Sequence, residues 1–271
     1  MTTIPIENAS PMQANRFAPA VLFPLFVGLS LIAYAGLTVT FGFPDILRAP
    51  APDILAAFRA QEAFVRGFYY LFAIAHLVFA AAVLTLYPAL KEGAGPWLLV
   101  GTAGGILYGI AQTMGFLRWP ILIPLFADYA ATRDMSGGEG DLALLMLNAF
   151  HHYTGNAIGE NLSFWGLGAW LVGIGMTLRQ AAFGHRAVGM LWILTGLMVF
   201  AYTFEQLGGP FAVLAPLLLL SHGMAYGLIL ALSWSLRKSS GDHVGLAPVG
   251  PMAGLAITVF CAAIVVPGLL P

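Results

Sequence analysis

The sequence predicts an all-α protein, a polytopic bundle of six to seven transmembrane helices, and three observations lead to that prediction. Of the 271 residues, 59% are hydrophobic and 8% are charged, whereas soluble domains are roughly a quarter charged. The apolar residues gather in stretches of about 20 residues or more, the length that crosses a bilayer. Nearly every charged residue lies between those stretches. The composition therefore excludes a soluble enzyme and a disordered chain.

Seven stretches are candidates for the membrane spans. They are residues 17–43, 67–88, 97–117, a long helix within 142–178, then 187–204, 211–236 and 252–269. The first follows a polar lead, residues 1–16. We expect it to be retained, because its apolar core is longer than that of a cleaved signal peptide and no clear cleavage site accompanies it. We expect residues 17–271 to form a single transmembrane domain.

Two of the connections between spans are long. In residues 44–66, apolar side chains recur at helical spacing among charged ones, which predicts a helix at the membrane interface after the first span. Residues 118–141 contain two prolines and then a polar run with the Gly137-Gly138 pair. That composition predicts a connection with a flexible turn.

Basic residues in the short loops predict the orientation. With the N-terminus inside, the inner loops carry Lys91, Arg179, Arg186, Arg237 and Lys238. The loop between the fifth and sixth spans and the C-terminus, both then outside, carry no lysine or arginine, although the two long outer loops do carry arginines. We expect a protein of the cell inner membrane with a cytoplasmic N-terminus. A net charge of −1 gives no reason to expect nucleic-acid binding, so the expected partner is the lipid bilayer.

Several polar side chains fall at a similar depth in different spans. We counted from the inner helix ends at about 1.5 Å per residue. The depths are about 28 Å for Glu160 and Glu205, about 26 Å for Gln112 and about 22 Å for His76 and His222. An ionisable group inside a membrane is costly and marks a candidate functional site. The sequence thus predicts a polar layer in the outer leaflet.

The densest polar stretch lies in the fourth span. Asn148, His152, Asn156 and Glu160 recur every four residues, which places them on one face of an α-helix. That face is too polar for lipid, so we expect it to line a cavity or to pack under the outer loops. A lone ionised Glu160 would be costly to desolvate. We expect it to pair with Arg118, Arg66, a histidine or a metal.

Residues 151–162 read His-His-Tyr-Thr-Gly-Asn-Ala-Ile-Gly-Glu-Asn-Leu. This run resembles the motif of an uncharacterised family of bacterial multi-pass membrane proteins, known only as a numbered domain of unknown function. The resemblance covers roughly the second to sixth spans. It implies a similar number of spans and implies no particular activity.

Three classes of function are compatible with the polar layer, and none of the patterns predicts a particular reaction. In the first, His76, His222, Glu160 and Glu205 hold zinc, iron or copper, or the two histidines are axial ligands of haem b. A small polar ligand would instead use His152, Asn156, Glu160, Gln112 and Arg118. The second class is a transporter or proton pathway. The third is a scaffold or accessory subunit, with glycine-rich helices packing against a membrane partner or a second copy. Each histidine could also simply make one interhelical hydrogen bond.

Overall fold

The computed structural model describes residues 11–92, 94–132, 138–180 and 186–238. Within these ranges, all regular secondary structure is helical. Six helical stretches there are long and apolar enough to cross a membrane. The predicted all-α transmembrane bundle is therefore confirmed, while the seventh predicted span, residues 252–269, lies outside the described residues.

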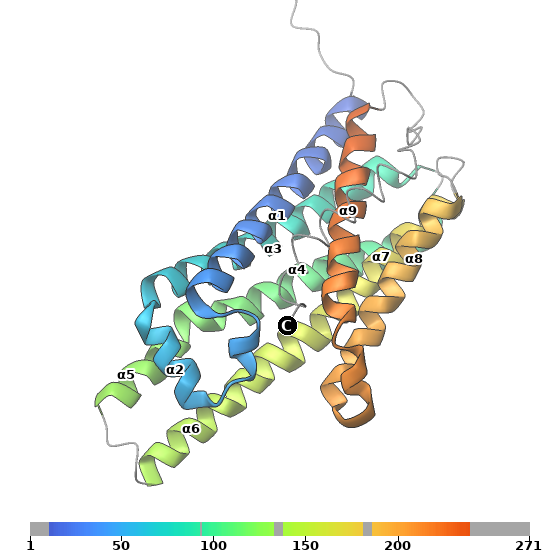
Figure 1. Cartoon of the computed structure of the whole chain (residues 1–271). Helices are drawn as coiled ribbons and strands as arrows, with labels where there is room; N and C mark the ends of the chain where they lie inside the picture. The colour runs from blue at the N-terminus through green and yellow to red at the C-terminus, as the bar shows by residue number, and fades with distance from the viewer. Residues whose placement is uncertain (1–10, 93, 133–137, 181–185, 239–271) are drawn as a thin grey trace, which may run out of the picture.

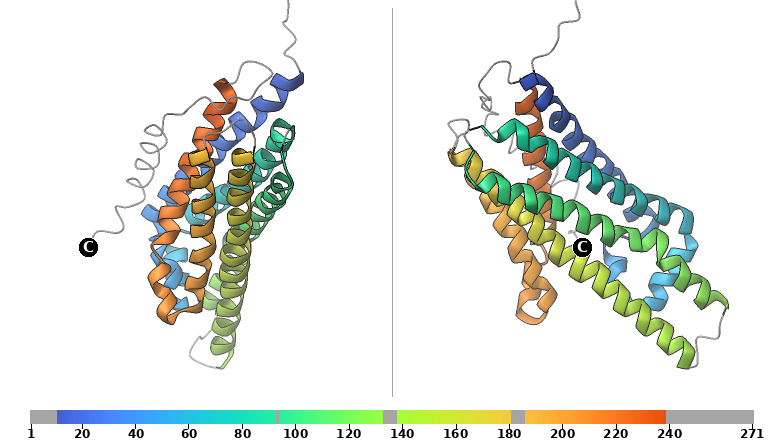
Figure 2. Two further views of the ribbon diagram at one scale, coloured as in Figure 1. Left: turned by 90° about the vertical axis from the view of Figure 1, so that its right-hand side faces the viewer. Right: turned by 180° about the vertical axis from the view of Figure 1, so that it is seen from behind.

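The spanning helices close into a ring (Figures 1 and 2). They are α1 (Pro11–Phe41), α3 (Glu62–Leu90), α4 (Trp97–Ile121), α7 (Ser163–Gln180), α8 (Arg186–Thr203) and α9 (Leu217–Lys238). Each packs against the next in this order, and α9 packs back against α1. Consequently α9 faces α3 and α4 across the interior of the ring instead of neighbouring them.

The outward faces of these helices are apolar as well. Large side chains such as Phe17, Val39 and Leu197 are more than half exposed. In water such continuous apolar surface is unusual for a monomer. In a bilayer it is the expected surface, because lipid tails are as apolar as the side chains that they contact.

Shorter helices gather at one end of the bundle (Figure 1). They are η1 (Asp45–Arg48), α2 (Ala51–Ala60), α5 (Ile123–Thr132) and α6 (Gly138–Phe150). The buried residues of α2 are Ala51, Ile54, Leu55 and Phe58. Their spacing makes α2 the amphipathic helix that was predicted after the first span.

The connection predicted at residues 118–141 is largely helical, contrary to the sequence interpretation. Helix α4 continues to Ile121 and α5 follows almost at once. The reason is burial, because Trp119 is fully buried and lies near the ring of Phe58 at a centroid distance of 6.4 Å. Packing against α2 thus keeps this segment helical, although its composition predicted a connection.

The fourth span is long, as predicted, and spans Leu142–Gln180. Its middle, η2 (His151–Leu162), is a π-helix, in which hydrogen bonds join residues five apart. Its turn is wider than the 3.6 residues of an α-helix, so residues four apart do not stay on one face. Accordingly His152 is exposed, whereas Asn156 and Glu160 are half-buried.

Glycines bring α4 into backbone contact with η2 and α7. A Cβ added to Gly173 would lie 2.5 Å from the Cα of Gly101, and one added to Gly115 would lie 2.8 Å from the Cα of Gly159. Neither distance is possible for real side chains, so only glycine permits this approach. We call this contact the glycine seam, and it holds the segment bearing Glu160 against α4.

Candidate functional site

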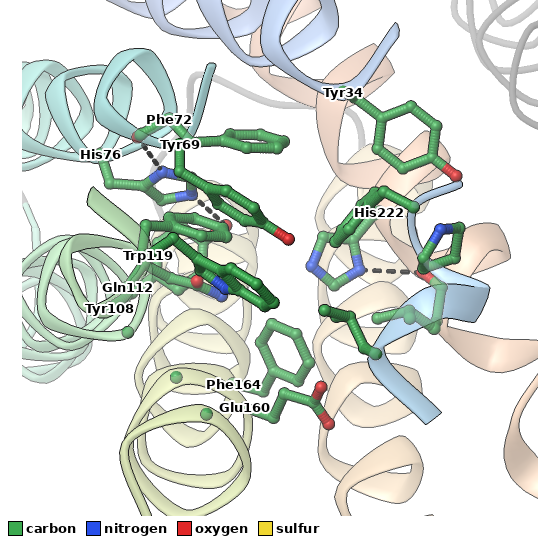
Figure 3. A pocket seen from close by; sticks show the side chains of 18 of the residues that line it. Tyr34, Tyr69, Phe72, His76, Tyr108, Gln112, Trp119, Glu160, Phe164 and His222 are labelled. Atoms are coloured by element: carbon green, nitrogen blue, oxygen red, sulfur yellow. Dashed lines mark hydrogen bonds between the residues drawn. The ribbon is translucent and has the colours of Figure 1, made fainter. Parts of the chain in front are cut away.

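A cavity of about 160 Å³ lies inside the helix ring. Its lining residues come from α1, the η1 segment, α3, α4, η2, α7 and α9 (Figure 3). A cavity of about 150 Å³ in another protein admits benzene, so this one is large enough for a small ring. Its walls are rich in aromatic side chains, which include Tyr34, Phe43, Tyr69, Phe72, Tyr108, Phe116, Trp119, Phe164 and Tyr226.

Five of the eight site residues predicted from sequence line this cavity. They are His76, Gln112, Arg118, Glu160 and His222. The other three belong to the described part of the chain but not to the lining. His152 is exposed, Asn156 donates to Gln206 at 2.9 Å, and Glu205 forms an ion pair with Arg48 at 3.1 Å.

The two histidines of the lining differ in whether a ring nitrogen is free to bind a ligand. His76 is 2% exposed, and its Nδ1 and Nε2 lie 2.8 Å from the carbonyl of Phe72 and 3.1 Å from the hydroxyl of Tyr108. A carbonyl only accepts, so Nδ1 carries the proton and Nε2 of the neutral ring accepts from Tyr108. Both nitrogens of His76 are therefore engaged, and one bond is interhelical.

His222 keeps one nitrogen free for the cavity. Its Nδ1 lies 2.8 Å from the carbonyl of Leu218 and is the donor by the same argument. Its Nε2 makes no hydrogen bond with the described residues and points toward the interior (Figure 3). In the neutral ring this nitrogen is an acceptor.

The geometry gives no support to a metal or haem site. Among the residues that the structure describes, no group of three or more His, Cys, Asp or Glu side chains could hold a metal ion. His76 could become a ligand only by losing its bond from Tyr108. The cavity of about 160 Å³ is smaller than the roughly 300–1,000 Å³ typical of pockets for drug-sized ligands. Metal binding stays a prediction from sequence.

Three unpartnered donors belong to residues that line the cavity. Tyr69 and Trp119 are 1% and 0% exposed, and their rings stack at 4.7 Å with an interplanar angle of 5°. The Tyr69 hydroxyl, the Trp119 Nε1 and the Arg118 Nε are buried without a hydrogen-bond partner in the described chain. Such a group costs about 1–3 kcal/mol. Three of them in one lining therefore need an explanation.

Arg118 is held in place beside Trp119. Its Nη1 donates to the carbonyl of Gly115 at 2.7 Å, and its guanidinium carbon lies 5.4 Å from the centroid of the Trp119 ring. A Cβ on Gly155 would lie 2.7 Å from the Arg118 Nη2. The absence of a side chain at Gly155 thus makes room for the guanidinium.

Glu160 has a partner that the sequence interpretation did not include. Its carboxylate accepts from the side-chain amide of Gln206, which lies in the single turn η3 (Phe204–Leu207) after α8. Arg66 pairs instead with Glu62 at 3.1 Å, and no ion pair between Arg118 and Glu160 occurs among the described residues. The turn at η3 brings Gln206 across to η2, which no spacing rule predicts.

Sequence reasoning missed Tyr69, Trp119 and Gln206. Tyr69 could have been found, because it precedes His76 by seven residues and Phe72 lies between them, a spacing that places all three on one helix face. Trp119 had been assigned to a connection. Gln206 carried no pattern, since its role depends on tertiary contact alone.

Comparison with known proteins gives a family and no activity. The model of a family described as a domain of unknown function, DUF4386, matches residues 21–237. That range contains all the spans that the structure describes except the first residues of α1 and the last of α9. No curated protein and no solved structure matches the chain.

Proposed function

The chain belongs to the DUF4386 family, and we propose that it binds a small, mainly apolar molecule with hydrogen-bonding groups inside its membrane-spanning bundle. The observation that carries the proposal is the set of three unpartnered donors on one aromatic-lined cavity. Ligand sites are typically concave and mostly apolar, with a few polar groups that fix orientation. A bound molecule would supply the missing hydrogen-bond partners.

The polar residues of the proposed site divide into two groups. Gln112, Arg118, Glu160 and His222 line the cavity and would contact the ligand directly. Asn156 would act through Gln206, which holds Glu160. Glu205 would act through Arg48, because this ion pair tethers η1, whose Leu47 lines the cavity together with Phe43 and Pro44 just before it. His152 is exposed and has no part in the proposed site.

We also propose that the N-terminus is cytoplasmic and that the membrane is the cell inner membrane. Lys91, Arg179, Arg186 and Arg237 lie at or beside the ends of α3, α7, α8 and α9, at one end of the ring (Figure 1). The positive-inside rule supports placing that end inside. A reporter inserted after Arg237 should read as internal, and an external reading would contradict this orientation.

A cavity-filling variant tests the proposed binding with 4-methylphenol as the probe. Leu219 lines the cavity, whereas its neighbour Leu220 is 47% exposed and lies outside the lining. Leu219→Trp should occupy the space and abolish binding, while the matched control Leu220→Trp should bind like the wild type. Isothermal titration of the purified protein in detergent measures both. If the wild type does not saturate, or if Leu219→Trp binds equally well, the proposal is wrong.

A further inference from the structure

The cavity has a donor side. The Tyr69 hydroxyl, the Trp119 Nε1 and the Arg118 Nε come from α3 and α4 and lack partners in the described chain. The indole and guanidinium groups can only donate, and the hydroxyl can also donate. A molecule that satisfies this side must therefore present an acceptor oxygen to it.

The opposite side of the cavity carries hydrogen-bond acceptors. The His222 Nε2 on α9 is free for a donor, and the Glu160 carboxylate lines the same cavity. Helix α9 faces α3 and α4 across the ring, and Figure 3 shows His222 opposite Tyr69 and Trp119. A molecule that satisfies this side must donate a proton to a hydrogen bond there.

The space between the two sides suits a flat ring. Phe72 and Phe116 stack at 4.6 Å with an interplanar angle of 8°, close to the stacked pair of Tyr69 and Trp119. Aromatic rings prefer offset-stacked or edge-to-face neighbours, which these walls offer. The cavity volume of about 160 Å³ matches one benzene-sized ring with small substituents.

We infer that the ligand is a hydroquinone-type molecule, a planar ring with hydroxyl groups at opposite ends. A hydroxyl group both accepts and donates, so one hydroxyl can accept from the side of Tyr69 while the other donates to His222 or Glu160. The inference rests on the proposed function and specifies the class of ligand.

Two probes of matched shape test the inference under anaerobic conditions. Hydroquinone carries a hydroxyl at each end of the ring, and p-xylene carries a methyl group at each end. The wild type should bind both probes saturably, and the hydrogen bonds to hydroquinone should show as a selective loss in variants, because burial of the two methyl groups favours p-xylene in the direct ratio. Titration at constant detergent concentration, corrected for partition into micelles, gives both affinities.

Variants of the two sides identify the atoms involved. Tyr69→Phe and His222→Phe each remove one polar group and keep a ring, so each should weaken hydroquinone binding about tenfold and leave p-xylene binding unchanged. Tyr70→Phe is the matched control, because Tyr70 is adjacent in sequence and 51% exposed. It should change neither affinity.

The possible outcomes separate the inference from the proposed function. Equal losses for both probes in the variants, or unchanged hydroquinone affinity in Tyr69→Phe and His222→Phe, would overturn the inference and indicate that water hydrates the unpartnered groups. Saturable binding of p-xylene would still support a ligand cavity in that case. If neither probe binds, the inference and the proposed function fail together.

Discussion

The glycine seam and the cavity are neighbouring regions of one helix bundle in which α4 packs in opposite ways, tightly at the seam and loosely at the cavity. At the seam, Gly101 and Gly173 allow the backbones to touch, and no side chain intervenes. On another face of α4, Gln112, Phe116 and Trp119 line open space between α4 and α9. Protein interiors are normally close-packed, so the seam represents the rule and the cavity the exception.

A second contrast lies within the cavity lining, between two tyrosine hydroxyls. The buried hydroxyl of Tyr108 bonds to His76, whereas the buried hydroxyl of Tyr69 has no partner in the described chain. Both tyrosines lie in the aromatic cluster beside His76. The difference teaches that the cavity lining holds both kinds of hydroxyl, because Tyr108 and Tyr69 both line the cavity and only Tyr108 has a partner in the described chain. Buried polar groups without such a partner also occur outside the lining, at Ser30 and Trp170.

Adding one methyl group at the seam should have the largest effect on stability. In Gly173→Ala, the new Cβ would lie 2.5 Å from the Cα of Gly101, and such overpacking typically costs about 1–3 kcal/mol. Gly28→Ala is the matched control, because a Cβ there has nothing within 4 Å. Thermal unfolding in detergent should show a lowered Tm for Gly173→Ala only. Equal Tm values for the two variants would refute the close contact.

The two tyrosines should respond differently to loss of their hydroxyls. Tyr108→Phe leaves the buried Nε2 of His76 without a donor, which should lower the free energy of unfolding by about 1–3 kcal/mol. Tyr69→Phe removes an unpartnered hydroxyl and should not destabilise the protein without ligand. Denaturation of both purified variants checks this. A loss for Tyr69→Phe as large as that for Tyr108→Phe would mean that Tyr69 has a protein partner.

Removing the charge of Glu160 should affect binding more than folding. Glu160→Gln keeps an oxygen that accepts from Gln206, so the Tm should stay close to that of the wild type while the affinity for hydroquinone falls severalfold. Glu205→Gln weakens a partly exposed ion pair with Arg48, worth about 0–1 kcal/mol, and should therefore lower the affinity less than Glu160→Gln does. Lost stability with intact affinity in Glu160→Gln would instead assign Glu160 a structural role.

The fold was largely predictable from the sequence because a bilayer imposes simple rules. Apolar stretches of about 20 residues must be helices, since lipid offers no hydrogen bonds to the backbone. Helix α2 was also predictable, because its apolar residues recur at helical spacing among charged ones. The helical continuation through Pro120 and the π-helix at residues 151–162 were not, because each depends on neighbouring segments. The buried Trp119 and the glycine seam exert their effects only in the assembled bundle.

The site was only partly predictable. Depth along each helix singled out His76, Gln112, Glu160, Glu205 and His222, and all of these except Glu205 line the cavity. The four-residue spacing from Asn148 to Glu160 led to the wrong prediction that these residues share one helix face, because a π-helix does not keep that spacing on one face. The hydrogen-bond partners also escaped prediction. Whether His76 or His222 keeps a free nitrogen depends on the position of Tyr108, which sequence spacing does not encode.

The central claim is that the unpartnered groups of the cavity face a bound molecule. The most direct measurement is a high-resolution density map of the protein purified from its native membrane under mild conditions. The account predicts flat non-protein density between the Tyr69 hydroxyl and the His222 Nε2, within hydrogen-bonding distance of both. A cavity closed by repacked side chains, with the Tyr69 hydroxyl bonded to another residue of the chain, would contradict it.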